Sequence, residues 1–322
     1  MKSTMIPALM LSFAVSSFGQ RGGVIGGGPR PGPGARGPVA TVSPWPLYPA
    51  NGAVPPEFAD RHVFLDAQGD ALIVLTDENG KKTIFRRELE NHVAPEVHSA
   101  VAKDSSGAFT YEYSFENRGN ARQRVNSFSI AVPALDVVQA TAMPDNWGAS
   151  KVAIQPSRLN WFAKYDGTAV SKGSAAFGFK ATSTYKPGLT FAYFTGLAVG
   201  EGLPPGPPKA DFELPDAVQT EMAPIGHIEF NSVAKLTIGP KFSSTTSRGE
   251  IAADFHVGIS RLVNRGDLDS QSRWVTETLT QLASFIDSTA NGMNAQIAIR
   301  QQPSTPLERE ISNALKLSLN VP

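Results

Sequence analysis

The chain of 322 residues contains no cysteine. This absence excludes disulfide bonds, and it excludes a lipid anchor attached through a cysteine at the N-terminus. The stability of the protein must therefore come from an ordinary hydrophobic core. The chain also has no Asn-x-Ser/Thr sequon, so nothing in it indicates a eukaryotic glycoprotein.

Charge of either sign is scarce. The 29 Lys and Arg residues balance 29 Asp and Glu residues, and charged residues make up 18% of the chain, below the usual share of about a quarter. A nucleic acid or an anionic membrane requires a clustered Lys/Arg footprint, and this composition excludes both partners. Glycine (29) and proline (25) are abundant instead, which favours turn-rich β structure and linkers.

Long hydrophobic runs are missing as well. The apolar stretch Thr4–Val15 is shorter than the roughly 20 residues of a membrane span. Lys2 precedes it and the small residues Ser17 and Gly19 follow it, which is the layout of a secretory signal peptide cleaved before Gln20. We therefore predict a signal peptide over residues 1–19, a secreted or periplasmic location in the bacterial envelope or exterior, and no transmembrane segment after its removal.

The rest of the chain divides into three predicted parts. Residues 20–60, in which 18 of 41 residues are Gly or Pro, form a linker, with Trp45, Leu47 and Tyr48 docking on the folded body. Residues 61–262 form a β-sandwich region with a Pro-rich crossover at 200–215. Residues 263–322 form a C-terminal helical segment.

The β prediction rests on a hydrophobic period of two. Phe109, Tyr111, Tyr113 and Phe115 alternate with polar residues, so these aromatic side chains should line one buried face together with Phe128 and Ile130. Further strands are predicted at His62–Asp66, Ala71–Thr76, Lys82–Arg87, Glu96–Ala102, Val125–Val132, Lys151–Ile154, Leu159–Tyr165, Ala175–Ala181, Leu189–Phe194, Gly226–Phe230, Ala234–Ile238 and Ile251–Ile259. Turn signals every 8 to 12 residues are typical of a sandwich or barrel.

The last 55 residues change to a helical period. One stripe predicts a helix with an N-cap at Asp269 or Ser270, and Thr305–Glu308 is a capping box that opens a second helix. The stripes consist of Val275, Leu279, Leu282 and Ile286, then Leu307, Ile311, Ala314 and Leu315. Two helices paired as a hairpin are therefore predicted to close the chain.

Part of the chain resembles the immunoglobulin-like modules of bacterial extracellular proteins. The motifs are Tyr111-x-Tyr113-x-x-x-Asn117-x-Gly-Asn120, Phe128-x-Ile130-x-x-Pro133 and Gly173-Ser174-x-x-Phe177. The resemblance covers roughly residues 96–195, about a third of the chain. It implies an antiparallel immunoglobulin-like β-sandwich and a role as a spacer, adhesion unit or binding accessory. Together with the other patterns it predicts a mainly β fold with additional strands and a C-terminal helical hairpin.

Residues that could carry catalysis are sparse. The five histidines form no HExxH motif or tight pair, and Glu96 and His98 on one strand face are too few ligands for zinc, so no metal or other cofactor is predicted. Glu112 and Glu116 share a face, but about 13 Å of strand separates them. A glycosidase needs its two carboxyl groups about 5 to 9.5 Å apart.

Aromatic residues are the better binding candidates. Trp147 lies in a turn-rich loop beside Asp145 and Asn146, and an exposed Trp or Tyr ring with polar neighbours can hold a sugar. We predict a ligand-binding site at Trp147, Asp145 and Asn146. Trp161 is either a core residue of the sandwich or part of such a platform.

The sequence favours a non-catalytic binding or structural protein, with a glycan or an envelope protein as the candidate partner. The alternative is a secreted polysaccharide hydrolase that uses carboxylates brought together only by the fold. The sequence leaves open which of the two roles is correct, and also the ligand and the oligomeric state.

Overall fold

The structure is a computed structural model that describes residues 45–197, 200–201, 216–222, 232–293 and 295–319. The predicted signal peptide, residues 20–44 of the predicted linker and the predicted strand Gly226–Phe230 lie outside these residues. Residues 202–215, the main part of the predicted Pro-rich crossover, also lie outside the described residues.

The described chain contains thirteen strands and four α-helices, with two short 3-10 helices, η1 (Pro56–Phe58) and η2 (Asp166–Thr168). The strands are β1 (Val63–Leu65), β2 (Ala71–Thr76), β3 (Lys82–Arg87), β4 (Pro95–Lys103), β5 (Phe109–Asn117), β6 (Val125–Ala131), β7 (Val138–Ala142), β8 (Trp147–Val152), β9 (Arg158–Ala163), β10 (Ser174–Ser183), β11 (Lys186–Gly196), β12 (Gly200–Glu201) and β13 (Val233–Phe242). The helices are α1 (Asp216–Met222), α2 (Arg248–Asn264), α3 (Arg273–Ala290) and α4 (Pro306–Leu319).

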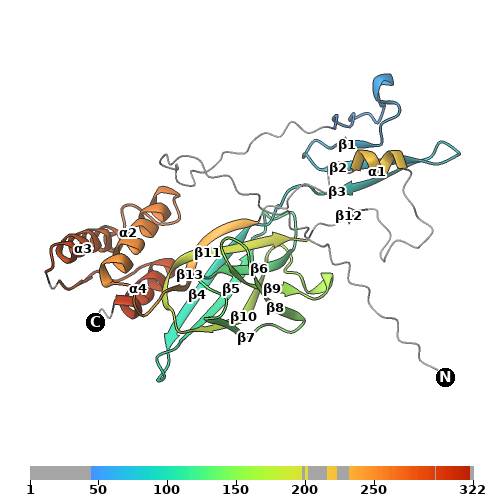
Figure 1. Ribbon diagram of the computed structural model, residues 1–322. Coiled ribbons are helices and arrows are strands. Elements are labelled where there is room, and N and C mark those ends of the chain that lie inside the picture. Colours follow the sequence, from blue (N-terminus) through green and yellow to red (C-terminus); the bar gives the residue numbers. More distant parts are fainter. Residues whose placement is uncertain (1–44, 198–199, 202–215, 223–231, 294, 320–322) are drawn as a thin grey trace, which may run out of the picture. The chain divides into compact units, whose positions relative to one another are not determined.

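Two antiparallel sheets form the predicted immunoglobulin-like sandwich (Figure 1). The four-stranded sheet has the order β4-β5-β10-β7, and the five-stranded sheet has the order β13-β11-β6-β9-β8. A third sheet, which we call the small sheet, has the order β1-β2-β3-β12 and lies outside the sandwich. Strand β7 had no sequence prediction, and β8 begins at Trp147, earlier than the predicted Lys151.

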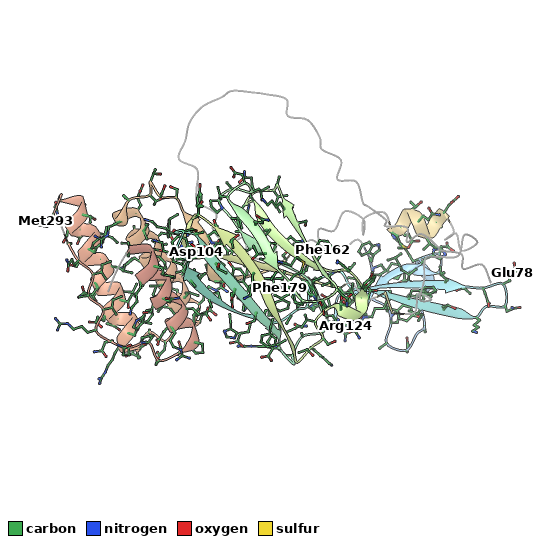
Figure 2. All side chains as sticks on the ribbon, turned by 90° about the horizontal axis from the view of Figure 1, so that it is seen from below. Glu78, Asp104, Arg124, Phe162, Phe179 and Met293 are labelled. Carbon is green, nitrogen blue, oxygen red and sulfur yellow. The ribbon has the colours of Figure 1, made fainter. Side chains whose placement is uncertain are left out.

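The core of the sandwich confirms the aromatic alternation. Tyr111, Tyr113 and Phe115 of β5 and Phe128 and Ile130 of β6 are all at most 2% exposed. Phe115 stacks on Phe179 with ring centroids 5.6 Å apart, and Figure 2 shows Phe179 between the sheets. A one-residue slip of either strand would turn these rings to solvent, so the hydrophobic pattern fixes the register.

Trp161 belongs to this core as well. Its ring is fully buried and stacks on Phe128 at 5.3 Å. Of the two possibilities that the sequence left open for Trp161, the core position is correct.

The C-terminal helices differ in part from the prediction. The residues predicted as strand Ile251–Ile259 lie in α2, so that prediction was wrong. The buried residues of α2 recur at helical spacing, at Ile251, Phe255, Ile259 and Leu262, and Ser247 and Glu250 form a capping box at its start. The helical part therefore begins at Arg248 rather than at residue 263.

The predicted hairpin paired the helices that are α3 and α4, but in the structure α3 lies side by side with α2 and forms the hairpin with that helix. Helix α4 packs on β4 and β11 of the sandwich (Figure 1). Ser272 caps α3, in place of the predicted Asp269 or Ser270. The capping box of α4 is as predicted: Glu308 N donates to Thr305 Oγ1, and the Glu308 carboxylate accepts from Thr305 N.

The small sheet has its own minor core. Trp45 packs with Val63 and Ala71 and donates its indole N–H to the carbonyl of Glu221 in α1. Trp45 is thus docked as predicted, and the ring of Tyr48 contacts Phe64 at 5.3 Å. Leu47 is different, because its side chain is 67% exposed.

Polar contacts join the small sheet to the sandwich. Asp70, only 1% exposed, accepts hydrogen bonds at 2.6 Å from Arg86 of β3 and from Arg122 of the loop before β6. The side-chain amide of Gln123 also donates to Glu88, which follows β3. These charged contacts replace the continuous apolar packing found inside the sandwich.

Candidate functional site

Trp147 does not form the predicted platform. As the first residue of β8 it points into the sandwich, where its ring contacts Phe179 at 5.1 Å and Phe115 at 6.3 Å, and it is only 4% exposed. The predicted stacking of a sugar on this ring is therefore wrong, because the alternation of the strand places the indole on its inner face.

Asp145 and Asn146, the other two predicted site residues, are exposed in the loop before β8. Asn146 has a φ of 63°, a left-handed conformation that Asn tolerates better than most residues. The turn closes with Trp147 N donating to the carbonyl of Pro144 at 3.2 Å. The structure thus separates the predicted site into an accessible polar loop and a buried ring.

Aromatic rings lie instead on the outer face of the five-stranded sheet. The register places Phe162 opposite Gly148 and Ser127, and Tyr193 opposite Ser129. Phe162, Phe191 and Tyr193 are half-buried, while their strand neighbours Trp161, Ala192 and Phe194 are buried in the core. We call Phe162, Phe191, Tyr193, Arg158 and Asn160 the aromatic face.

Small residues let these rings lie flat against the sheet. A Cβ atom at position 148 would stand 2.5 Å from Cζ of Phe162, so only glycine leaves room for that ring. On the central strand β6, the outward residues Ser127, Ser129 and Ala131 have short side chains. The larger side chains of β9 and β11 therefore reach toward one another across β6.

Arg158 makes the closest of these contacts. Its guanidinium carbon lies 3.6 Å from the centroid of the Tyr193 ring, and Tyr193 lies 6.2 Å from Phe191. Nearby, Ser127 Oγ donates to Asn160 Oδ1 at 2.8 Å. The aromatic face thus offers π surfaces, one stacked cation and amide and hydroxyl groups, which are the groups that hold sugars and other flat polar ligands.

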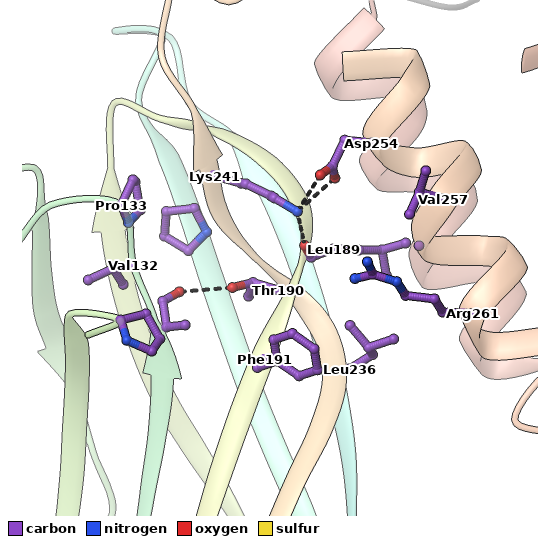
Figure 3. A pocket seen from close by; sticks show the side chains of 14 residues that line it. Val132, Pro133, Leu189, Thr190, Phe191, Leu236, Lys241, Asp254, Val257 and Arg261 are labelled. Atoms are coloured by element: carbon purple, nitrogen blue, oxygen red, sulfur yellow. Dashed lines mark hydrogen bonds and ion pairs between the residues drawn. The ribbon is translucent and has the colours of Figure 1, made fainter. Parts of the chain in front are cut away.

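A groove of about 410 Å³ continues the aromatic face toward α2. Its floor includes Ala131, Phe191 and Leu236 of the sheet, and its wall includes Val257 and Arg261 of α2 (Figure 3). Helix α2 comes close to β11 because residue 258 is glycine; a Cβ there would stand 2.5 Å from Cδ1 of Leu189. Val257 remains 47% exposed at the groove edge.

The charged residues in and beside the groove differ in whether a carboxylate neutralises them. Lys241 donates to Asp254 at 2.7 Å and to the carbonyl of Leu189 at 2.6 Å, so its charge is balanced (Figure 3). Among the described residues no carboxylate lies within ion-pair distance of Arg261 or Arg158. Among the residues that the structure describes, Asp254 is the single carboxylate that lines this groove.

The other sheet has a different outer face. There Glu112 forms an ion pair with Lys180 at 2.5 Å, and Glu96 with Arg118 at 2.6 Å. One exposed ring, Phe177, stands on a β-bulge next to Gly178, whose φ is +87°. This face is mainly charged, as the sequence predicted for the polar side of β5.

A second groove, of about 400 Å³, lies between β4, the end of α2 and the start of α4. Its acidic residues all have partners: Glu96 binds Arg118, Asp267 binds Arg265 at 3.2 Å, and Asp269 accepts from the backbone of Gln271 at 2.9 Å. None of them is set out as a free carboxyl for acid-base chemistry.

Carboxyl groups with a raised pKa lie outside the groove along α2. Burial raises the pKa of Glu310, and hydrogen bonds from Ser99 and the contact with His98 oppose this rise. Burial also raises the pKa of Glu88, opposed by the bond from Gln123. Each group joins two structural elements, so we assign both a structural role. Among the described residues there is no group of three His, Asp or Glu side chains placed to hold a metal ion.

The sequence patterns did not predict a role in binding for Tyr193, Phe191, Arg158 or Arg261. A signal for the first two existed, because the strand Leu189–Phe194 has apolar residues in both alternating positions, as a strand covered on two faces does. The pairing of Arg158 with Tyr193 depends on strand order, which no local pattern contains.

No family and no curated protein matches the sequence. Among solved structures, the chain resembles an uncharacterised protein from Nocardia farcinica with an immunoglobulin-like fold, at 15% identity and a TM-score of 0.25, covering 40% of this chain and 94% of that one.

Two further solved structures resemble part of the chain. One is a cohesin module of a family 33 glycoside hydrolase from Clostridium perfringens, at 12% identity and a TM-score of 0.25, covering 48% of this chain and 98% of the module. The other is a GH20 exo-β-N-acetylglucosaminidase from Vibrio harveyi, at 11% identity and a TM-score of 0.22, covering 33% of this chain and 17% of the enzyme. No helix of the described residues is long and apolar enough to cross a membrane.

Proposed function

We propose that the protein is a non-catalytic glycan-binding protein of the bacterial envelope or exterior, with the aromatic face as its binding surface. The observation that carries the proposal is the set of half-buried rings Phe162, Phe191 and Tyr193 on one sheet face, with Arg158 stacked on Tyr193. Sugar rings pack their C–H faces on aromatic rings, while amide, hydroxyl and guanidinium groups bind their hydroxyls.

Asp145 and Asn146 have a place in this proposal as a polar rim. Their loop leads into β8, where Gly148 lies beneath the ring of Phe162. The two exposed side chains therefore precede Gly148 by three and two residues, in the loop at this end of the aromatic face. They are proposed to hydrogen bond to sugar hydroxyls at this end, without Trp147.

The proposed secreted or periplasmic location rests on Lys2, the apolar stretch Thr4–Val15 and the small residues before Gln20. N-terminal sequencing of the protein recovered from the periplasm or medium tests it. A mature chain that begins at Gln20 is the expected result. A chain that keeps Met1 in the cytoplasm would contradict the proposed location.

A hydrolase is supported less well. Retaining and inverting glycosidases need two carboxyl groups about 5 to 9.5 Å apart on either side of the bond they cleave. In the described part of the chain, one carboxylate lines the groove beside the aromatic face, Asp254, and Lys241 neutralises it at 2.7 Å. This supports binding without cleavage at that site.

Binding of soluble oligosaccharides to the native protein and to Tyr193→Ala tests the proposal. Affinity in the micromolar to millimolar range, about −4 to −8 kcal/mol, is expected for the native protein. Loss of the Tyr193 ring removes its stacking contribution of about 1.4 kcal/mol, or tenfold in affinity. Calorimetric titration after selection of ligands on a glycan array measures both values.

Tyr165→Ala is the matched control, because Tyr165 is 66% exposed and does not belong to the aromatic face. It should bind like the native protein. If Tyr193→Ala binds every glycan as well as the native protein does, or if no glycan binds, the aromatic face is not a glycan site.

A further inference from the structure

The groove between α2 and the five-stranded sheet narrows the class of glycan. We infer that its ligand is an anionic polysaccharide, whose carboxylate or sulfate groups bind Arg158 and Arg261. This inference rests on the proposed glycan-binding function and adds the charge of the ligand. Its basis is the cavity of about 410 Å³, which Arg261 lines, together with Arg158, which pairs in the strand register with Ala131 of the groove floor.

The two arginines come from different elements on the same outer face of the five-stranded sheet. Arg158 is on β9, two strands away from β11, whereas Arg261 is on α2, which packs against β11. Figure 3 shows the Arg261 side chain extending from α2 toward the sheet. A chain lying along the floor formed by Ala131 and Phe191 would therefore have a cation on each side.

The apolar floor explains why the ligand should be a sugar chain rather than a simple anion. Phe191, Leu236 and Val257 line the groove with carbon surface, and Tyr193 extends it on the aromatic face. Pyranose rings have C–H faces that pack on such carbon surfaces. Inorganic anions have no C–H surface, so these apolar residues would not contribute to their binding.

The charge balance points to an anionic ligand. Lys241 and Asp254 neutralise each other at 2.7 Å. Arg158 and Arg261, in contrast, have no carboxylate within ion-pair distance among the described residues. The Arg158 Nε atom is buried and makes no hydrogen bond in the described structure. A guanidinium binds carboxylate and sulfate through paired N–H groups, so these two side chains are suited to the acidic groups of such a chain.

The experiment compares four polymers on the purified full chain: polygalacturonate, dextran sulfate, neutral dextran and poly-glutamate. We expect polygalacturonate or dextran sulfate to bind at least tenfold more tightly than dextran at low salt, with affinity that falls as salt rises. The stronger of these two anionic polymers distinguishes carboxylate from sulfate as the bound group.

Variants then assign the binding to the groove. Arg261→Gln should lower affinity for the anionic glycan about tenfold and leave weak binding of dextran unchanged. Arg158→Gln also removes a group of the aromatic face, so it should lower affinity for both polymers, and for the anionic glycan by a larger factor. Arg158→Lys keeps the charge and should lose less than Arg158→Gln. Arg273→Gln is the control, because Arg273 is an exposed arginine of α3 that does not line the groove. Thermal melting of each variant verifies that it is folded.

The outcomes separate this inference from the proposed function. If polygalacturonate binds only as tightly as dextran, and Arg261→Gln does not change its affinity, the anionic ligand is overturned and the glycan site still stands. If poly-glutamate binds as tightly as the anionic glycans, and Tyr193→Ala does not change its affinity, the ligand is an acidic peptide and not a sugar chain. If none of the polymers binds and glycan arrays are also negative, both proposals fail.

Discussion

The sandwich and the small sheet are built from the same kind of strand but are held together differently. In the sandwich, rings from β5, β6, β9, β10 and β11 form one cluster that continues into the buried faces of the helices. In the small sheet, two small clusters of buried apolar residues lie around Val63 and around Phe85, and Phe64 packs separately against Tyr48. Its link to the sandwich consists largely of polar contacts through Asp70 and Gln123.

This difference shows that, without disulfide bonds, the two regions are stabilised according to how many apolar side chains each of them can bury. A large aromatic core stabilises a sandwich without covalent links, because each buried ring removes a large apolar area from water. A sheet of short strands cannot bury enough surface alone, so it depends on α1 and on charged contacts with its neighbour. We therefore expect the two regions to respond differently to substitution.

The largest effect should come from the sandwich core. Phe115 contacts Phe128, Trp147, Phe179 and Phe194, so Phe115→Ala should lower the free energy of unfolding by about 3–5 kcal/mol. Urea denaturation followed by tryptophan fluorescence measures it. Phe85→Ala in the small sheet is the comparison, and it should leave the transition of the sandwich in place. A loss below 1 kcal/mol at Phe115 would contradict the account of the core.

A smaller and local effect is expected at the polar link. Asp70→Asn removes a buried charge that binds Arg86 and Arg122 at 2.6 Å, at a cost of about 1.5–3 kcal/mol. Both arginines are about a third exposed, so water recovers part of the loss. Hydrogen exchange should become faster in β1–β3 and stay unchanged in β5 and β6. Equal acceleration in both regions would mean that they unfold as one unit.

The sandwich has its own buried acid, Glu310, which joins α4 to β4 without an arginine. Burial raises its pKa in the folded protein, so the folded state holds the proton more tightly than the unfolded state does. Stability should then decrease as pH rises from the ordinary Glu range through the raised pKa. Hydrogen bonds from Ser99 and the contact with His98 oppose this rise of the pKa.

Glu310→Gln should flatten this decrease, since the amide is neutral at every pH and can still accept from Ser99. Melting temperatures measured from pH 4 to pH 8 test the prediction. Glu112→Gln, in the exposed pair with Lys180, is the control and should keep the slope of the native protein. An unchanged slope in Glu310→Gln would assign the pH dependence to another group.

The smallest effect is expected N-terminal to the small sheet. Residues 20–44 are rich in Gly and Pro and offer little to bury, whereas the docked residue Trp45 follows immediately. Deleting residues 20–44 should leave the melting temperature unchanged within error. A decrease of several degrees would show that the packed region of the small sheet extends into this segment.

Local patterns predicted the sandwich well. The alternation around Tyr113 gave β5 and its buried face, and the capping box at Thr305 gave the start of α4. The failures have physical causes. Residues 251–259 contain Ile, Val and Phe in short succession, which fits both a strand and a helix, and only the spacing of Phe255 and Ile259 with Leu262 favours the helix.

The binding surface was harder to predict than the fold. Trp147 follows turn residues in the sequence, but the strand begins at the tryptophan itself and turns its ring inward. The aromatic face arises from pairing between strands that are far apart in the chain, as when Arg158 of β9 meets Tyr193 of β11 across β6. Such contacts depend on strand order, which residue types and spacing do not specify.

The claim that the aromatic face binds sugar is tested most directly by mapping a bound oligosaccharide with NMR. Titration of the labelled protein should shift the signals of Arg158, Phe191 and Tyr193, and leave those of Glu112, Phe177 and Lys180 on the opposite sheet unchanged. Shifts confined to the opposite sheet, or to the small sheet around Asp70, would contradict the assignment of the binding surface.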